Sequence, residues 1–156
     1  MGWMRSNGAA PAEIEAIYRD RCRAFLFAVT AFLGDGEAAL DVVQDGFALA
    51  LRNRSSYCRE GSLEAWLWRI VLNVARDRQR SRRRLAALPE FEATEDAREP
   101  DDEVRASLLA LPERQRLAVF LRYYADLSYE QIAEALGVRA GTVAASLHAA
   151  HSARPC

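Results

Sequence analysis

The sequence predicts an all-α protein of two small helical domains joined by an acidic, flexible linker, and three observations lead to this prediction. Sustained alternation of apolar and polar residues, the pattern of a half-buried strand, is missing. Alanine, leucine, arginine and glutamate dominate the 156 residues, and all four are good helix formers. Charge then divides the chain. Residues 1–88 hold 14 arginines against ten acids, residues 89–103 one arginine against eight acids, and residues 104–156 six arginines against four acids. Two mildly basic bodies joined by an acidic tether suit modules that each meet an anion.

The first domain is expected to follow a disordered arm at residues 1–11. Helically spaced apolar residues predict a helix over 12–33, and Gly34-Asp35-Gly36 ends it. A second helix is expected over 37–53. Its predicted buried stripe consists of Leu40, Val43, Phe47 and Leu51.

A polar loop over 54–61 separates the second helix from the third. Ser62 is a suitable N-cap, because its side-chain oxygen can accept from free backbone N–H groups of the first turn. The third helix is expected over 63–86, with Trp68 on another face from the inward residues Trp66, Leu67, Ile70 and Val74.

The linker is expected over 87–102, where two prolines and most of the acidic residues lie. The second domain is expected over 103–156, with helices over 103–110, 113–124, 128–136 and 140–151. Ser128 and Gln131 stand at the spacing of a capping box, in which each side chain serves the other residue's backbone N–H.

Residues 127–151 have the pattern of a helix-turn-helix. Ile132 and Leu136 share one helix face, and Gly137 can adopt the left-handed conformation that ends a helix. Val143 and Leu147, four residues apart, are expected to face back onto the first helix. The second helix of such a motif enters the major groove of DNA, although a plain helical hairpin uses the same apolar spacing.

Several other classes of protein are disfavoured. No apolar run approaches the roughly 18 residues of a membrane span, and no secretory signal is visible, so a cytoplasmic protein is expected. Cys22, Cys58 and Cys156 form neither a disulfide framework nor a zinc-binding pair, even with His148 and His151. No nucleophile–base arrangement or phosphate loop is visible. We therefore expect no enzyme activity, metal or cofactor.

Three segments resemble parts of bacterial sigma factors. Residues 39–51 (ALDVVQDGFALAL) are similar to region 2.2, and residues 62–80 (SLEAWLWRIVLNVARDRQR) to regions 2.3 and 2.4. Residues 111–150 resemble region 4. The likeness extends over about 13–151, and a layout without region 3 points to the extracytoplasmic-function (ECF) group of the sigma-70 family. It implies a region 2 three-helix bundle at 12–86 and a region 4 four-helix domain at 103–156.

The resemblance also implies partners and sites. The partners are core RNA polymerase (its largest and second-largest catalytic subunits), promoter DNA and an anti-sigma factor. The polymerase-binding residues would be Asp41, Gln44 and Asp45, although exposed acids are also common on ordinary solvated faces. Residues that melt and read the −10 element would be Tyr57, Arg59, Ser62, Trp66, Asn73, Arg76 and Arg80. Of these, Trp66 also fits an ordinary core position.

The basic run at residues 78–85 (RQRSRRRL) has two interpretations. The resemblance places it against phosphates at the edge of the −10 duplex. A solvated helix end is the alternative, because cations favour the C-terminal end of the helix dipole.

The predicted recognition helix departs from the family pattern. Arg139, Thr142, Ser146 and His148 are the residues that would contact the −35 element. Relatives carry Lys or Arg where this chain has Ala144, Ser146, Ala149 and Ala150. Since phosphate contacts carry most non-specific affinity, −35 binding is expected to be weak, to be dominated by DNA shape, or to be helped by Arg114, Arg116 and Arg122. Gly46, inside a helix, is a second departure from the family.

Two further readings remain beside a promoter-specificity subunit. One is a helix-turn-helix regulator that acts without polymerase, although residues 12–86 do not suggest a ligand or dimer domain. The other is a defective sigma-like protein that binds polymerase but not promoters, which the alanine-rich recognition helix favours.

Overall fold

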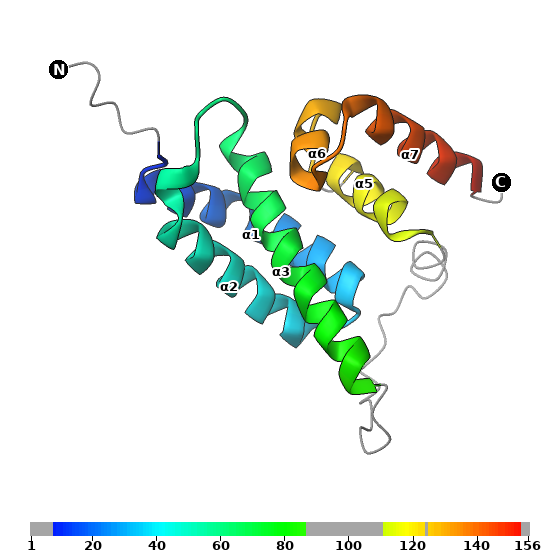
Figure 1. Cartoon of the computed structure of the whole chain (residues 1–156), viewed down its shortest axis with the longest axis horizontal. Coiled ribbons are helices and arrows are strands. Elements are labelled where there is room, and N and C mark those ends of the chain that lie inside the picture. The colour runs from blue at the N-terminus through cyan, green and yellow to red at the C-terminus, as the bar shows by residue number, and fades with distance from the viewer. Residues whose placement is uncertain (1–7, 87–110, 124, 154–156) are drawn as a thin grey trace.

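The computed structural model describes residues 8–86, 111–123 and 125–153, and these form helices without strands, as the sequence predicts. The N-terminal bundle consists of α1 (Pro11–Leu33), α2 (Gly36–Arg52), the short 3-10 helix η2 (Arg54–Ser56) and α3 (Leu63–Ala86). The C-terminal bundle consists of α5 (Glu113–Tyr123), α6 (Tyr129–Leu136) and α7 (Ala140–Ala153) (Figure 1). The predicted linker at 87–102 and helix at 103–110 lie outside the described residues.

The turn between α1 and α2 is made by local backbone chemistry. Gly34 takes the left-handed conformation (φ 76°), and its N–H donates to the Thr30 carbonyl at 2.6 Å. Asp35 Oδ1 then accepts from the backbone N–H groups of Glu37 and Ala38, at 3.0 and 3.3 Å. Gly34 therefore ends one helix, as the Gly34-Asp35-Gly36 sequence predicts, and Asp35 caps the next, a role that was not predicted from the sequence.

Residues 8–10 differ from the expected disordered arm. Ala9 is buried, and its N–H donates to the Arg54 carbonyl at 2.9 Å. Helix α1 begins at Pro11, a residue suited to a first helical position, and Glu13 Oε1 accepts from the Ala10 N–H at 3.0 Å. This segment is ordered because it packs against the loop before α3.

Three aromatic rings form the centre of the N-terminal bundle. Phe25 of α1 and Trp68 of α3 stack with ring centroids 3.9 Å apart, and Phe47 of α2 meets Phe25 edge-on at 5.0 Å. Trp68 is completely buried. The predicted inward face of α3 was therefore only partly right: Leu67 is buried, but Trp66, Ile70 and Val74 are half-buried. The inward face carries Trp68, Val71, Leu72 and Ala75, which have helical spacing.

The predicted stripe of α2 was also partly wrong. Val43 and Phe47 are buried, but the side chains of Leu40 and Leu51 are exposed, with 42% and 37% of their surface accessible. The helix buries a face of smaller residues instead, made of Ala39, Val42, Val43, Gly46, Phe47 and Ala50. Small residues on that face let α2 lie close to α3.

Gly46 is explained by this close approach. A Cβ built at Gly46 would lie 2.7 Å from Cγ2 and 3.1 Å from Cα of Val71 on α3. The glycine costs about 1 kcal/mol in helix propensity relative to alanine. The need for a glycine at residue 46 therefore comes from the close approach of α3 in the same bundle.

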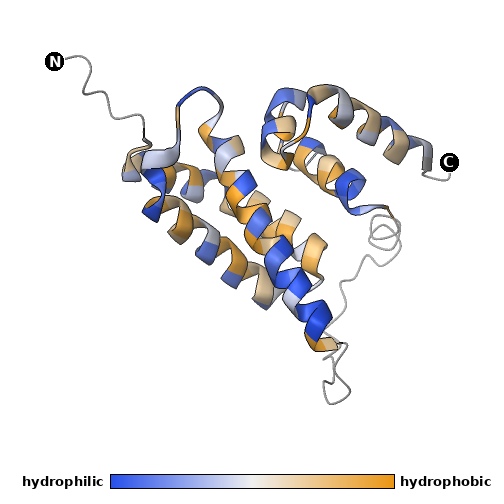
Figure 2. Cartoon of the chain, in the orientation of Figure 1, coloured by the Kyte–Doolittle hydropathy of each residue, from blue (hydrophilic) through white to orange (hydrophobic). Residues whose placement is uncertain are grey.

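The two bundles pack against each other. Helix α3 lies against α6 and α1 against α5, and one continuous set of buried side chains extends through both bundles. In Figure 1, α3 runs between the other helices of its own bundle and the C-terminal bundle. The last third of α3, which carries the basic run at residues 78–85, is mostly hydrophilic and ends in an apolar tip (Figure 2).

Candidate functional site

The exposed face of α2 combines apolar and acidic side chains. Asp41 and Gln44 are exposed there, as a docking surface requires. Leu40, Gln44 and Leu51 stand at i, i+4 and i+11, so they share one side of the helix. Asp45 lies on another side of α2, and its Oδ2 is 3.6 Å from Arg78 Nη2 of α3. Leu40 and Leu51 were missed as surface residues because apolar character alone placed them in the buried stripe.

Tyr57 belongs to the framework of the loop before α3. The ring is buried, and its hydroxyl donates to the Gly61 carbonyl across the loop. Burial raises the pKa of the Tyr57 phenol above its ordinary value. Trp66 lies beside it, with ring centroids 5.5 Å apart. The two rings form an aromatic wall at the start of α3, and only Trp66 has an appreciable exposed surface.

Arg59 fixes the same loop to the start of α1. Its backbone is left-handed (φ 61°), a conformation that costs a non-glycine residue about 1–2 kcal/mol. Its Nε donates to the Gly8 carbonyl at 3.1 Å, and its Nη2 lies 2.6 Å from Glu13 Oε1. The hydrogen bond from Arg59 holds the pKa of the Glu13 carboxyl below its ordinary range, with a smaller effect from the Ala10 N–H. Arg59 is thus engaged with the N-terminal segment.

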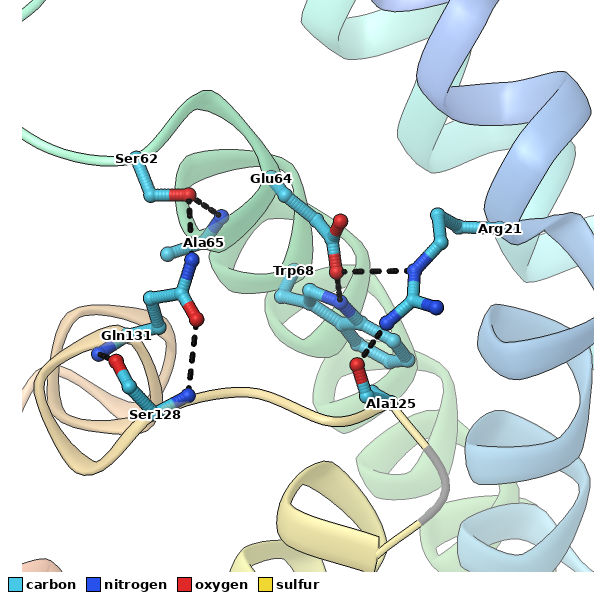
Figure 3. Close-up of polar contacts among 8 residues, drawn as sticks. All are labelled: Arg21, Ser62, Glu64, Ala65, Trp68, Ala125, Ser128 and Gln131. Carbon is cyan, nitrogen blue, oxygen red and sulfur yellow. Dashed lines mark hydrogen bonds and ion pairs between the residues drawn. The ribbon is translucent and has the colours of Figure 1, made fainter.

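Ser62 is a meeting point between the two bundles (Figure 3). Its Oγ accepts from the Ala65 N–H at 3.2 Å, which confirms the predicted N-cap of α3. The same oxygen accepts from Gln131 Nε2 of α6 at 3.3 Å. The Ser62 N–H donates to Glu134 Oε2, also of α6, at 3.1 Å. A carboxylate of the C-terminal bundle therefore binds the backbone at the start of α3.

A second polar group lies next to this contact (Figure 3). Arg21 of α1 donates through Nε to Glu64 Oε2 at 3.2 Å and through Nη2 to the Ala125 carbonyl. Trp68 Nε1 donates to the same Glu64 oxygen at 3.3 Å. Arg21 thus connects the buried tryptophan of the N-terminal bundle to the turn between α5 and α6.

The −10 residues predicted on α3 form one stripe. The predicted Ser62 and Arg76 and the intervening Arg69, which was not predicted, are spaced by seven residues, which returns to nearly the same side of a helix after two turns. Asn73 is exposed beside them, and Arg80 is paired with Asp77. Arg76 Nε lies 3.0 Å from Glu113 Oε1, at the start of α5. This stripe therefore faces α5 and α6 at several points.

The helix-turn-helix prediction is confirmed in its geometry. Ser128 N donates to Gln131 Oε1 at 2.9 Å, and Gln131 N donates to Ser128 Oγ at 3.1 Å, so the capping box is complete. Gly137 ends α6 in the left-handed conformation, at φ 70°. Val143 and Leu147 are buried, as expected for residues that hold α7 against α6.

Helix α7 presents few groups to DNA. Arg139, just before the helix, and His148 are exposed, and Thr142 is half-exposed. Ser146 differs from its predicted role, because only 9% of its surface is accessible. It stands one residue before Leu147 and four before Ala150, on the side that packs inward. Arg139 is the one arginine between residues 123 and 153.

The three arginines of α5 differ in their surroundings. Arg114 is exposed. The Arg116 guanidinium lies 5.8 Å from the centre of the Phe32 ring of α1, and burial lowers its pKa. Arg122 Nη1 donates to the Leu127 carbonyl at 3.3 Å. Arg114 and Arg122 are both exposed and match the expectation of cations that could supplement α7, whereas Arg116 is half-buried.

The part of the chain that the structure describes contains neither a candidate metal site nor a membrane-spanning helix. Among residues 8–86, 111–123 and 125–153, no three His, Cys, Asp or Glu side chains are grouped as a metal site would need. No helix in those ranges is long and apolar enough to cross a membrane.

The comparisons with known proteins agree with this arrangement. Residues 17–85 match the family Sigma-70 region 2, and residues 101–151 match Sigma-70, region 4. The ECF RNA polymerase sigma factor EcfG of Rhodopseudomonas palustris is 32% identical over 138 residues, covering 83% of this chain and 75% of that protein. The chain belongs to the ECF group of the sigma-70 family. Region 2 of this sigma factor is the N-terminal bundle, and region 4 includes the C-terminal bundle.

Other sigma factors give the same result. The ECF sigma factor SigE of Mycolicibacterium smegmatis is 36% identical over 128 residues, which cover 74% of this chain and 49% of that protein. The sigma factor RpoE of Bartonella quintana, in a structure with the anti-sigma factor NepR, aligns with a TM-score of 0.73. That alignment covers 90% of this sigma factor and 93% of RpoE, at 23% identity, and supports the shared fold.

Proposed function

We propose that this chain binds core RNA polymerase, directs it to promoters and helps to open the DNA, without being an enzyme itself. The observation that carries the proposal is the presence of both sigma regions in order on one chain, at residues 17–85 and 101–151. A helix-turn-helix regulator that acts without polymerase needs only the second of them.

Helix α2 is the proposed polymerase-binding surface. Asp41 and Gln44 supply charge and hydrogen bonds, and the exposed Leu40 and Leu51 beside them supply apolar area. Interfaces generally combine an apolar centre with a polar rim. Asp45 is assigned to the edge of this surface because it also lies near Arg78. The largest and second-largest polymerase subunits are the proposed partners.

The loop before α3 and the α3 stripe are the proposed −10 site. An unstacked base needs an aromatic face and hydrogen bonds, while arginine neutralises the strand. Trp66 supplies an accessible ring, and Asn73, Arg76 and Arg80 supply polar and basic groups on one side of α3. Tyr57 and Arg59 are assigned a supporting role, because they brace the loop.

The C-terminal bundle is the proposed −35 site. Arg139, Thr142 and His148 are the residues assigned to DNA, and the buried Ser146 is left out. With so few cations, binding at this element is expected to contribute less affinity than the polymerase does. An anti-sigma protein is a proposed further partner, as RpoE of Bartonella quintana has in its complex with NepR. A partner of RNA polymerase is expected to act in the cytoplasm.

Reconstitution with purified core polymerase tests the proposal. The holoenzyme should transcribe a set of genomic sites that core polymerase alone does not use, and sequencing the transcript starts should reveal shared −10 and −35 elements. If this chain fails to bind core polymerase, the proposal is wrong.

A defective sigma-like protein is the second candidate, and one observation favours it: α7 carries no arginine or lysine within Ala140–Ala153. Such a protein would bind core polymerase tightly in the same reconstitution and yet produce no specific transcripts.

A further inference from the structure

We propose that Gly8, Ala9 and Glu13 form an N-terminal brace, which holds the loop before α3 in the conformation that takes up an unstacked base of the −10 element. They are positioning residues for base recognition, although they lie before residue 17, where the match to Sigma-70 region 2 begins. The inference rests on the proposed function, because it takes the aromatic wall at the start of α3 to be the place where the base stacks.

The segment before α1 is bound to the loop through its backbone. The Ala9 N–H donates to the Arg54 carbonyl at 2.9 Å, and only 4% of the surface of Ala9 is accessible. Gly8 fits closely against the same part of the loop, because a Cβ built there would lie 2.7 Å from Arg54 O and 2.7 Å from Ser55 Cα. Both atoms belong to the loop backbone, so a larger residue at position 8 must displace the loop or the segment itself.

The side chain of Glu13 holds the second half of the loop through Arg59. Arg59 Nη2 lies 2.6 Å from Glu13 Oε1 and Nη1 lies 3.4 Å from Oε2, a two-point contact that fixes direction as well as distance. Arg59 Nε also donates to the Gly8 carbonyl at 3.1 Å. The guanidinium carbon lies 5.9 Å from the centre of the Tyr57 ring. A series of contacts therefore leads from α1 through Arg59 to the aromatic wall.

The loop needs this support because the backbone of Arg59 is strained. A left-handed residue (φ 61°) persists only where the surrounding contacts impose that conformation. Without the brace, relaxed conformations of the loop should outnumber the observed one roughly five- to thirtyfold. Six of the eight residues at 54–61 are exposed, so packing against the rest of the N-terminal bundle offers little replacement. The affinity for a captured base should fall with the fraction of loops that keep the observed conformation.

The test measures base capture by the reconstituted holoenzyme. Single-stranded oligonucleotides carry the non-template strand of a −10 element found by transcript sequencing, with an abasic site at each position in turn. At the captured position, the parent should bind the intact strand about tenfold more tightly than the abasic strand, because stacking on an aromatic side chain contributes affinity of this order. The readout is the ratio of the two affinities, since a partly unfolded variant loses affinity for both strands alike.

Two variants disrupt the brace in different ways. Glu13→Ala removes the carboxylate, and Gly8→Ala introduces the steric clash without changing charge. Both should reduce the ratio to about twofold or less, while the abasic strand binds as it does to the parent. Glu15→Ala is the charge control, because Glu15 forms an exposed 2.6 Å pair with Arg19 on the same helix. Gly36→Ala is the steric control, because nothing lies within 4 Å of a Cβ there.

The outcomes separate the inference from the proposed function. If the parent prefers the intact strand at no position, or if Trp66→Ala keeps the preference at every position, the −10 assignment is wrong and the inference falls with it. If the parent shows the preference and both brace variants retain it, the proposed function stands and the inference is wrong. Loss of the preference in both brace variants with both controls unchanged supports the inference, whereas equal loss in the controls overturns it.

Discussion

The Cβ position of Gly46 lies 2.7 Å from Val71 Cγ2, so α2 and α3 approach each other more closely than any larger residue would permit. The backbone of α3 contributes to this restriction, because Val71 Cα is only 3.1 Å away. A methyl group at residue 46 must displace a helix as well as a side chain. The packing of region 2 thus depends on a residue that weakens its own helix.

Gly46→Ala should lower the free energy of unfolding by about 1–3 kcal/mol, since overpacking outweighs the gain in helix propensity. Gly141→Ala is the matched control, because nothing lies within 4 Å of a Cβ there, and it should be neutral or stabilising. Urea unfolding measures both changes. Equal stability of Gly46→Ala and the parent would mean that the two helices separate freely at this point.

The ion pair between Glu13 and Arg59 should make stability depend on acid pH. The folded-state pKa of Glu13 is lowered, chiefly by the hydrogen bond from Arg59, while its ordinary value is 4.5. The contribution is therefore fully present above pH 4.5 and is lost as pH falls through the lower folded value. The parent should exceed Glu13→Gln in unfolding free energy near pH 7, and the difference should shrink below pH 4.5. A difference that stays constant from neutral to acid pH would contradict the assignment.

The sequence predicted the helices well because their signals are local. Gly34, Ser62 and the Ser128–Gln131 pair act within one turn of chain, and each has its predicted role. The orientation of side chains depends on neighbours far along the chain, and there the prediction was incomplete. Nothing near Trp68 in the sequence indicates that Phe25 will stack on it.

The candidate site likewise combines local features that the sequence predicts with long-range contacts that it does not predict. Spacing correctly placed Asn73, Arg76 and Arg80 on one side of α3, because that depends only on helix geometry. Spacing gave no sign that Glu113 and Glu134 would contact Arg76 and Ser62, which lie 37 and 72 residues away from them. Ser146 was assigned to DNA by its polarity, but packing against the rest of the C-terminal bundle buries it.

Charge reversal on α2 should separate polymerase binding from folding. Asp41→Arg should weaken binding to core polymerase by about tenfold or more, because a like-charge contact at an interface costs several kcal/mol. Asp20→Arg makes the same charge change on an exposed face of α1 and should bind as the parent does. Native co-elution or fluorescence titration with core polymerase measures the effect. Equal weakening by both variants would point to non-specific attraction.

The last prediction concerns the recognition helix, whose expected low affinity for DNA should rise when a cation is added. Ala144 is exposed on α7, so an added cation there could reach a phosphate. Ala144→Arg should tighten holoenzyme binding to a duplex promoter recovered by transcript sequencing, and should steepen the slope of log K against log salt by about 0.9, the value for one added phosphate contact. Arg139→Ala should act in the opposite direction. Asp20→Asn adds the same unit of charge far from α7 and is the control. Neither arginine variant should alter the rate at which bound holoenzyme opens the −10 region, because that step is assigned to α3. If Ala144→Arg and the control change affinity and slope alike, α7 does not lie against the DNA, and the defective sigma-like alternative gains support.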